Sequence, residues 1–200
     1  MREERDYITR RLLPLEAYEP AEPPSEAHAP AAVLVPLIER PEGLSVLLTL
    51  RTSHLRSHAG QIALPGGRTD PGETPWETAL REAWEEVGLD PKLVDVAGLS
   101  EPFWTRTGYV ITPVVGFVSP ALTVTPNPDE VAEVFEVPFA FLMDAANHQA
   151  MERVFPDGVT RVVWAMPYQD RHIWGVTANL LKALHTRLFG DEAEAGEGGG

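Results

Sequence analysis

Residues 67–89 read GRTDPGETPWETALREAWEEVGL, a glycine-bearing loop followed by a stretch with the residue spacing of a helix. Near its end the carboxylates Glu82, Glu85 and Glu86 lie within five residues, beside Arg81. On a helix these carboxylates fall within an arc of roughly 100°. Like charges at this spacing repel each other, so a helix gains from the grouping only where a cation binds. The alternative is a solvated acidic face.

The signals for the helix itself are strong. Thr74 suits the N-cap, Pro75 suits the first helical position, and Glu77 completes a Thr-x-x-Glu capping box. Gly88 is expected to end the helix. An apolar stripe that must face a core comprises Trp76, Ala79, Leu80, Ala83 and Val87. On the helical wheel the carboxylates lie directly beside this stripe, at the edge of the packed face, where a cleft could form.

The loop before the helix is rich in bends and poor in bulky side chains. Residues 64–67 read Leu-Pro-Gly-Gly and residues 71–72 read Pro-Gly, so backbone groups can come close to a ligand. Such a loop, leading into a helix with three clustered acids, predicts a divalent-metal site for a phosphate-containing substrate. Hard cations such as Mg²⁺ prefer oxygen ligands and are commonly shared with substrate phosphates.

The same stretch resembles the signature of the Nudix hydrolases, Gly-x5-Glu-x7-Arg-Glu-U-x-Glu-Glu-x-Gly-U, where U is apolar. Its positions are filled by Gly67, Glu73, Arg81, Glu82, Ala83, Glu85, Glu86, Gly88 and Leu89. Every fixed position is present, and only Ala83 is small for an apolar position. The resemblance implies an α/β (α+β) fold of the Nudix type, an α/β/α sandwich with a mixed central β-sheet. It also implies hydrolysis of a nucleoside diphosphate linked to another group.

The composition is that of a globular protein with one sizeable core: 200 residues, 44% hydrophobic and 23% charged. The absence of cysteine excludes disulfides, thiol catalysis and cysteine-ligated zinc. The sequence has no apolar run long enough to span a bilayer and no signal-peptide pattern, so we expect a cytoplasmic protein. A net charge of −14 argues against nucleic acid as the main partner. A small anionic substrate would then need metal ions and a few arginines.

Three segments are expected along the chain. Residues 1–30 predict a short helix over 2–13 and then a Pro-rich arm, interpreted as a loose linker. Residues 31–190 would form the Nudix hydrolase domain. Residues 191–200 are acidic and glycine-rich and are predicted to be disordered. Because the arm could dock or make a dimer contact, both a monomer and a homodimer remain open.

Apolar runs and turn residues predict the elements of the domain. Strands are expected at residues 31–39, 44–51, 92–98, 110–118 and 130–136, a short helix at 139–143, a hairpin of 150–155 with 160–169, and a last helix at 177–188. Pro113 indicates that its strand lies at an edge or contains a bulge. This order fits a mixed sheet sandwiched by helices. Residues 101–109 are expected to form a loop with aromatic residues and Arg106, and Trp164 and Trp174 are interpreted as core residues.

Cationic residues gather before the glycine loop of this acidic chain. They are Arg51, His54, Arg56 and His58. Arginine suits phosphate because its planar fork binds oxygens in pairs. The alternative is a solvated loop with scattered charges. The two histidines are interpreted as hydrogen-bonding residues of the loop rather than as metal ligands.

Residues 47–67 resemble the pattern that precedes the signature in the coenzyme A pyrophosphatase branch of the family. That pattern reads Leu-Leu-Thr-x-Arg-Ser/Ala-x3-Arg-x3-Gly-x3-Phe-Pro-Gly-Gly, and this chain departs from it at Thr52 and Leu64. Residues 127–131 and 173–178 also resemble this branch, so the resemblance covers residues 31–185. It implies that coenzyme A, or its thioester or disulfide derivatives, is hydrolysed to 4′-phosphopantetheine and adenosine 3′,5′-bisphosphate.

The resemblance also implies the residues of the site. With Mg²⁺ or Mn²⁺ as the cofactor, Glu82 and Glu86 would be the principal metal ligands, and Glu85 would bind directly or through water. Arg81 would hold an acidic neighbour in place, with Glu73 as the candidate.

An acid outside the signature would complete the site or act as the base. Glu130 is the first candidate and Glu101 the second, and the alternative for Glu130 is a surface acid. Arg51 and Arg56 would bind phosphates, including the 3′-phosphate of coenzyme A. Gly66 and Gly67 would contact the substrate through their backbone, and the Gly66 carbonyl could be a further metal ligand.

Two other functions remain open on the sequence. The first is a Nudix hydrolase for ADP-ribose, a dinucleotide or a nucleoside triphosphate. The second is a Nudix-fold binding module without catalysis, which the intact acid cluster disfavours because a binder does not need three carboxylates. In each case the expected partner is a small molecule, with neither nucleic acid nor membrane.

Overall fold

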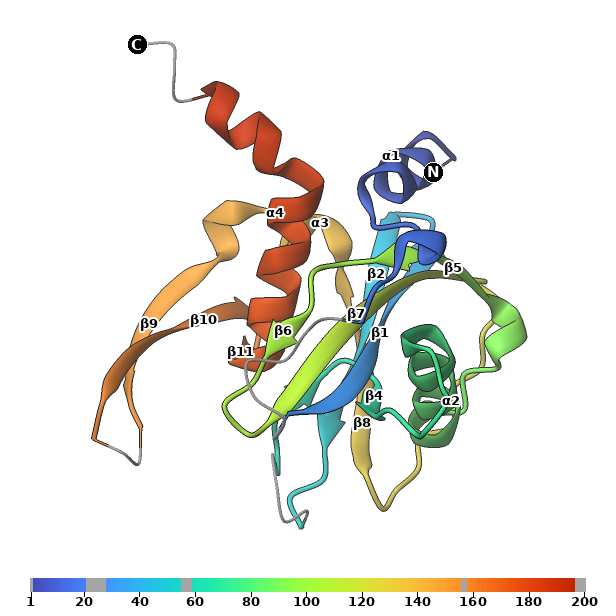
Figure 1. Cartoon of the computed structure of the whole chain (residues 1–200), viewed down its shortest axis with the longest axis horizontal. Helices are drawn as coiled ribbons and strands as arrows, with labels where there is room; N and C mark the ends of the chain where they lie inside the picture. The colour runs from blue at the N-terminus through green and yellow to red at the C-terminus, as the bar shows by residue number, and fades with distance from the viewer. Residues whose placement is uncertain (1, 21–27, 55–58, 156–157, 197–200) are drawn as a thin grey trace.

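A mixed eight-stranded sheet runs through the computed structural model, which describes residues 2–20, 28–54, 59–155 and 158–196 (Figure 1). Its strands are β1 (Ala29–Arg40), β2 (Gly43–Arg51), β3 (Ile62–Ala63), β4 (Gly66–Arg68), β5 (Val94–Leu99), β6 (Phe103–Trp104), β7 (Tyr109–Val118) and β8 (Val131–Pro138). The central order is β3-β2-β1-β7-β5, while β4 pairs with β1, β6 with β7, and β8 with β2. β1 and β7 are parallel, and the other named pairs are antiparallel.

Helices cover both faces of this sheet, which confirms the predicted α/β/α sandwich (Figure 1). The continuous apolar run of β1 follows from this arrangement, because successive side chains of a strand point to opposite faces. Leu34 and Ile38 pack on one side, and Val35 and Leu37 pack on the other.

Helix α2 (Pro75–Val87) covers one face and carries the acid cluster. Its capping box is present: the Thr74 side chain accepts from the Glu77 backbone N–H, and the Glu77 side chain accepts from the Thr74 backbone N–H. Gly88 ends the helix at φ 69°, a left-handed conformation that glycine adopts without strain. Both predicted ends of this helix are therefore confirmed.

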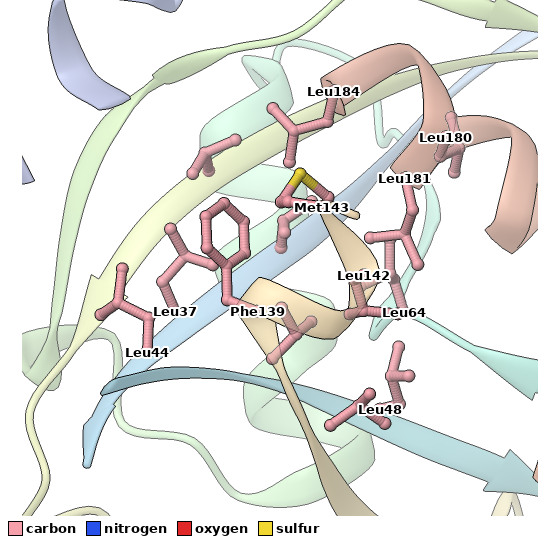
Figure 2. Packing of buried hydrophobic residues seen from close by; sticks show 14 of the residues in the cluster. Leu37, Leu44, Leu48, Leu64, Phe139, Leu142, Met143, Leu180, Leu181 and Leu184 are labelled. Atoms are coloured by element: carbon pink, nitrogen blue, oxygen red, sulfur yellow. The ribbon is translucent and has the colours of Figure 1, made fainter. Parts of the chain in front are cut away.

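The other face packs against α1 (Arg2–Arg11), α3 (Phe139–Leu142) and α4 (Val176–Gly196). Figure 2 shows Phe139, Leu142 and Met143 between the sheet and the leucines of α4. Ile8 of α1 is 1% exposed, so the N-terminal helix is packed on the core. Within the described residues, no helix has the length and apolar composition that crossing a bilayer requires.

A second, three-stranded antiparallel sheet stands beside α4. It consists of β9 (Gln149–Val154), β10 (Thr160–Tyr168) and β11 (Arg171–Trp174), in the order β11-β10-β9. The predicted hairpin of β9 and β10 is confirmed, although residues 156–157 of its turn lie outside the described residues. Figure 1 shows this hairpin projecting away from the main sheet.

The arm after α1 is more ordered than the sequence suggested. Leu13 and Leu99 exchange two backbone hydrogen bonds of 2.9 Å, and a 3-10 turn follows at Leu15–Ala17. Leu12 is buried over Gly98, where a Cβ would lie 2.7 Å from the Leu12 Cβ. Apolar contact and strand-like pairing hold Leu12 and Leu13, and the 3-10 turn follows directly, so the interpretation as a loose linker was wrong for the turn at Leu15–Ala17. Residues 21–27 of the predicted arm lie outside the described residues.

Two further expectations differ from the structure. The backbone of α4 continues to Gly196 instead of ending at residue 188, because Asp191–Ala195 consists of Asp, Glu and Ala without proline, and Ala and Glu favour helix. Residues 197–200 of the predicted disordered tail lie outside the described residues. β7 is an interior strand, so Pro113 is not at an edge. It lies opposite the gap between β5 and β6, where its carbonyl accepts from the Ser100 N–H at 3.0 Å.

Candidate functional site

Glu86 is the most buried of the clustered carboxylates, with 3% of the residue exposed. Its Oε2 accepts a hydrogen bond from the Gly66 backbone N–H at 3.2 Å. Burial raises the pKa of Glu86 to about 7, and the acids Glu82 and Glu130 add to this rise. The Gly66 N–H and Arg51 oppose it. A carboxylate in this position is a strong candidate for cation binding, because a bound cation would offset the cost of its burial.

Arg51 lies at the end of β2 and points at the acid cluster. Its Nη1 is 3.5 Å from Glu86 Oε1, and a quarter of its side chain is exposed. Its buried Nε has no hydrogen-bond partner among the described residues. The antiparallel pairing of β2 with β3, together with the following glycine strand β4, brings Arg51 and Gly66 to the same carboxylate. The predicted meeting of the cationic stretch with the acids is therefore present for Arg51.

Glu82 lies one helical turn before Glu86 and fits against the glycine strand. A Cβ on Gly67 would lie 2.5 Å from Glu82 Cδ, so only glycine leaves room for this carboxylate at its present position. Burial raises the pKa of Glu82, and Arg81 opposes that rise through a 2.8 Å ion pair. Gly67 thus has a steric role beside the acids.

Arg81 organises the acidic side of the site. Its Nε and Nη2 donate to the two carboxylate oxygens of Glu73 at 2.7 and 3.0 Å, the bidentate geometry that arginine favours. Its Nη1 contacts Glu82 at 2.8 Å and Glu85 at 3.3 Å, and its Nη2 also donates to the Arg68 carbonyl. The bond from Arg81 is the main cause that lowers the pKa of Glu73 to about 2. The Arg81–Glu73 pairing agrees with the candidate named from the sequence.

The two acids outside the signature differ clearly in their surroundings. Glu130 precedes β8, its charge raises the pKa values of Glu82 and Glu86, and its carbonyl accepts from the Thr52 N–H at 3.0 Å. Glu101 instead forms an ion pair with Arg187 of α4 and accepts from the Ser100 hydroxyl. The charge of Glu130 therefore acts on the acid cluster, whereas the carboxylate of Glu101 is directed at a different helix.

The residues present fit a divalent cation. Three carboxylates with hard oxygen donors lie together on α2, Glu86 is buried, and a side chain on Gly67 would block Glu82. Within the described ranges, no three carboxylate or imidazole side chains converge closely enough to enclose an ion. The reason is that Arg81 draws Glu82 and Glu85 towards itself, while Glu86 faces Gly66 and Arg51. Metal binding would require rotation of these side chains.

A cavity of about 290 Å³ opens beside the acid cluster. Its described lining includes Arg51, Gly66, Gly67, Arg68 and Trp174. Trp164 packs partly buried against the core, as expected, whereas Trp174 contributes to the wall of this cavity. The sequence interpretation assigned no role to Arg68, whose exposed side chain follows directly after the glycine pair.

The rest of the predicted cationic stretch is only partly described. His54 Nε2 lies 3.2 Å from the Asp129 carbonyl oxygen and 3.4 Å from the Thr52 hydroxyl, in agreement with its interpretation as a hydrogen-bonding loop residue. Arg56 and His58 lie outside the described residues.

Comparisons with known proteins agree with this geometry. Residues 28–158 match the NUDIX domain. The chain is 41% identical over 162 residues to a protein named uncharacterized Nudix hydrolase NudL from Escherichia coli O7:K1, covering 80% of this chain and 83% of the relative. The protein of the same name from Escherichia fergusonii gives the same values.

A solved structure shares the fold. The crystal structure of a MutT/nudix family protein from Enterococcus faecalis superposes with a TM-score of 0.50 and 19% identity, covering 96% of this chain and 74% of that protein. The domain match spans more than half of the chain and includes the whole of α2 and the glycine strand β4. The chain with this acidic helix therefore belongs to the Nudix hydrolase family.

Proposed function

We propose that this protein hydrolyses the pyrophosphate bond of coenzyme A and of its thioester or disulfide derivatives. Water attacks one phosphorus, the bridging P–O bond breaks, and the products are 4′-phosphopantetheine and adenosine 3′,5′-bisphosphate. The observation that carries this proposal is the contact between Arg51 and Glu86. It joins the stretch that resembles the coenzyme A branch, residues 47–67, to the acids of the Nudix signature.

The proposed metal ligands are the carboxylates of α2. Glu82 and Glu86 would be the principal ligands of Mg²⁺ or Mn²⁺, Glu85 a ligand directly or through water, and the Gly66 carbonyl a further one. A bound divalent ion neutralises diphosphate charge and lowers the pKa of a coordinated water. The Glu85 side chain is 53% exposed, against 17% for Glu82, and this supports a smaller contribution of Glu85 to metal binding.

The chain's other residues position and activate the reactants. Arg51 binds diphosphate oxygens with its guanidinium fork, and Arg56 is proposed to assist it. Gly66 and Gly67 let the substrate approach the backbone. Arg81 is a positioning residue, because its contacts fix Glu73 and Glu82. Glu130 is proposed as the base that accepts the proton of the attacking water, since its charge acts on both Glu82 and Glu86.

The proposed setting is the cytoplasm, with a small-molecule substrate and without nucleic acid or membrane as a partner. The net charge of −14 and the absence of cysteine support this setting. The protein is proposed to act as a monomer or a homodimer.

The test is a substrate panel. The protein is incubated with Mg²⁺ and with coenzyme A, ADP-ribose or dinucleotides in parallel, and the products are identified by mass. Adenosine 3′,5′-bisphosphate from coenzyme A is the expected product. Turnover of ADP-ribose or a dinucleotide without turnover of coenzyme A would assign the function to another nucleoside diphosphate derivative. No turnover of any member would favour a binding module without catalysis.

A further inference from the structure

The backbone of Arg68, the last residue of the glycine strand β4, is held firmly in place. Arg68 pairs with Ala31 of β1, and its carbonyl accepts from Arg81 Nη2 at 3.1 Å. The N–H of the next residue, Thr69, donates to the Pro30 carbonyl at 3.0 Å. Arg81 therefore contacts both the acids of the site and the backbone of Arg68.

The side chain of Arg68, in contrast, is not used by the protein itself. It is exposed, and it forms no ion pair or hydrogen bond with any described residue. Arg68 also lines another cavity together with Asp70 and Glu73, but it pairs with neither acid, and Glu73 is bound by Arg81. A guanidinium on a fixed backbone, with its N–H donors unused, is available to bind an external anion in a bidentate manner.

The strand directs this side chain away from the acids of α2. Gly67 faces Glu82, because a Cβ on Gly67 would lie 2.5 Å from Glu82 Cδ. Adjacent residues of a strand point to opposite faces, so Arg68 points to the other face. It contributes there to the lining of the 290 Å³ cavity, as Arg51 does. No Asp or Glu is among the described lining residues of this cavity, so its described charged side chains are both positive.

Arg51 and Arg68 are placed for different parts of a bound substrate. Arg51 contacts the Glu86 carboxylate, which also accepts from the Gly66 N–H. Arg68 is two residues beyond Gly66 in an extended strand, which separates their Cα atoms by about 7 Å. A diphosphate at Glu86 is therefore served by Arg51, whereas Arg68 is displaced along the cavity towards the part of the substrate that follows the diphosphate.

The rest of the cavity wall suits a nucleoside. Apolar side chains line it, among them Val33, Leu64 and Ile111, and Tyr109 and Trp174 supply aromatic rings on which a base can stack. Mostly apolar walls with a few polar groups are typical of small-molecule sites. The volume of about 290 Å³ is near the lower limit for such sites, so the cavity takes one end of the substrate rather than the whole molecule.

We propose that Arg68 binds a phosphate that the substrate carries beyond the scissile diphosphate, and that it thereby selects substrates with this group. In coenzyme A the group is the 3′-phosphate of the ribose. The inference rests on the proposed function, because that function places the diphosphate at the acid cluster. It also changes one expectation: the sequence placed this phosphate with Arg51 and Arg56, whereas Arg51 lies at Glu86.

The direct test measures ligand binding without metal and without turnover. Calorimetry compares adenosine 3′,5′-bisphosphate with AMP, which lacks the 3′-phosphate, on wild-type protein and on Arg68→Gln. We expect wild type to bind the bisphosphate about tenfold more tightly, as one charge-assisted contact would give, and Arg68→Gln to bind both ligands alike. Equal binding of the two ligands by wild type, or a preference that Arg68→Gln retains in full, would overturn the inference.

Two further variants separate a specific contact from a general effect of charge. Arg10→Gln removes the same charge from an exposed position on α1, and Arg10 does not line the cavity, so the preference should match that of wild type. Arg68→Lys keeps the charge without the planar fork and should retain part of the preference. If Arg10→Gln reduced the preference as much as Arg68→Gln did, the effect would come from net charge and the inference would be wrong.

Steady-state kinetics keep this inference separate from the proposed function. With coenzyme A and dephospho-coenzyme A as substrates, Arg68→Gln should raise KM about tenfold for coenzyme A and change it little for the dephospho compound. An equal rise for both substrates would place Arg68 at the diphosphate, and no rise would remove it from the site, so either result contradicts the inference while the proposed function stands. If wild type hydrolyses neither compound, the proposed function fails, and the binding comparison still decides the role of Arg68.

Discussion

Two arginines contact the acid cluster, and their surroundings differ. Arg81, on α2, contacts Glu73, Glu82, Glu85 and a backbone carbonyl. Arg51, at the end of β2, has one ion pair of 3.5 Å with Glu86, and its Nε has no partner among the described residues. Arg81 therefore stabilises the protein's own acids, whereas Arg51 retains binding capacity for an external anion.

Glu73 and Glu86, the acids that Arg81 and Arg51 contact, differ in their pKa values. Glu73 is ionised and paired, and its pKa lies at about 2 because Arg81 donates two hydrogen bonds to it. Glu86 is buried and has a pKa of about 7, because desolvation raises this pKa more than the Gly66 N–H and Arg51 lower it. The difference indicates that one side of the site is already neutralised within the protein, while the other can accept a proton or a further cation.

The largest effect is expected at Glu86. Glu86→Gln keeps the size of the side chain and the acceptor for the Gly66 N–H, but it removes the charge that would bind the metal. We expect turnover to fall by more than about a hundredfold, the upper end of losses for groups that only support a metal ligand. Turnover is measured with saturating Mg²⁺, and thermal unfolding should show a melting temperature no lower than that of wild type. Unchanged turnover would remove Glu86 from the metal site.

Glu130→Gln is the next test, because it asks whether the acid whose charge acts on the cluster takes part in the chemistry. Loss of a general base should lower kcat about a hundredfold with a smaller change in KM. The matched control is Glu101→Gln, which breaks the ion pair with Arg187 away from the cluster and should change kcat less than about twofold. The reverse order of effects would identify Glu101 as the functional acid.

Arg51→Lys tests whether the available arginine serves the substrate. Lysine keeps the charge but loses the planar fork, so KM should rise about tenfold while the fold remains intact. The matched comparison is Arg171→Lys, which alters a paired arginine on β11 whose two Nη atoms donate to Glu133. Equal KM values for wild type and Arg51→Lys would show that Arg51 does not bind the diphosphate.

The smallest effect is expected from substitution of Glu73, the acid paired with Arg81, and it concerns the stability of the protein. The folded pKa of about 2 lies below the ordinary value of 4.5, so this group contributes stability that is complete above about pH 4.5. That contribution declines as the pH falls towards 2, because the unfolded chain binds the proton first. Glu73→Gln should cost about 1 kcal/mol at neutral pH, since the pair is partly exposed to solvent.

Chemical denaturation of wild type and Glu73→Gln across this pH range measures the effect. The stability difference between the two proteins should shrink as the solution is acidified. A constant difference from pH 6 to pH 2 would mean that Arg81 does not hold Glu73 in the way the geometry indicates.

Much of the acidic side could be predicted from the sequence, because its determinants are local. The capping box at Thr74 and Glu77 and the stop at Gly88 set the helix, and the periodicity of the helix then places Glu82 and Glu86 on adjacent turns. The pair between Arg81 and Glu73 spans eight residues and follows from the same helix start. These features depend on neighbours in the chain and need no knowledge of strand pairing.

The tertiary structure decided the rest. The choice between Glu130 and Glu101 depends on which strand each acid adjoins, and the meeting of Arg51 with Glu86 depends on the packing of α2 against the sheet. The sequence alone thus determined the acidic helix and its family, because helix signals act over a few residues. The position of Arg51 and Glu130 relative to the acid cluster depends on pairing between strands that are distant in the sequence. Only the folded chain specifies that pairing.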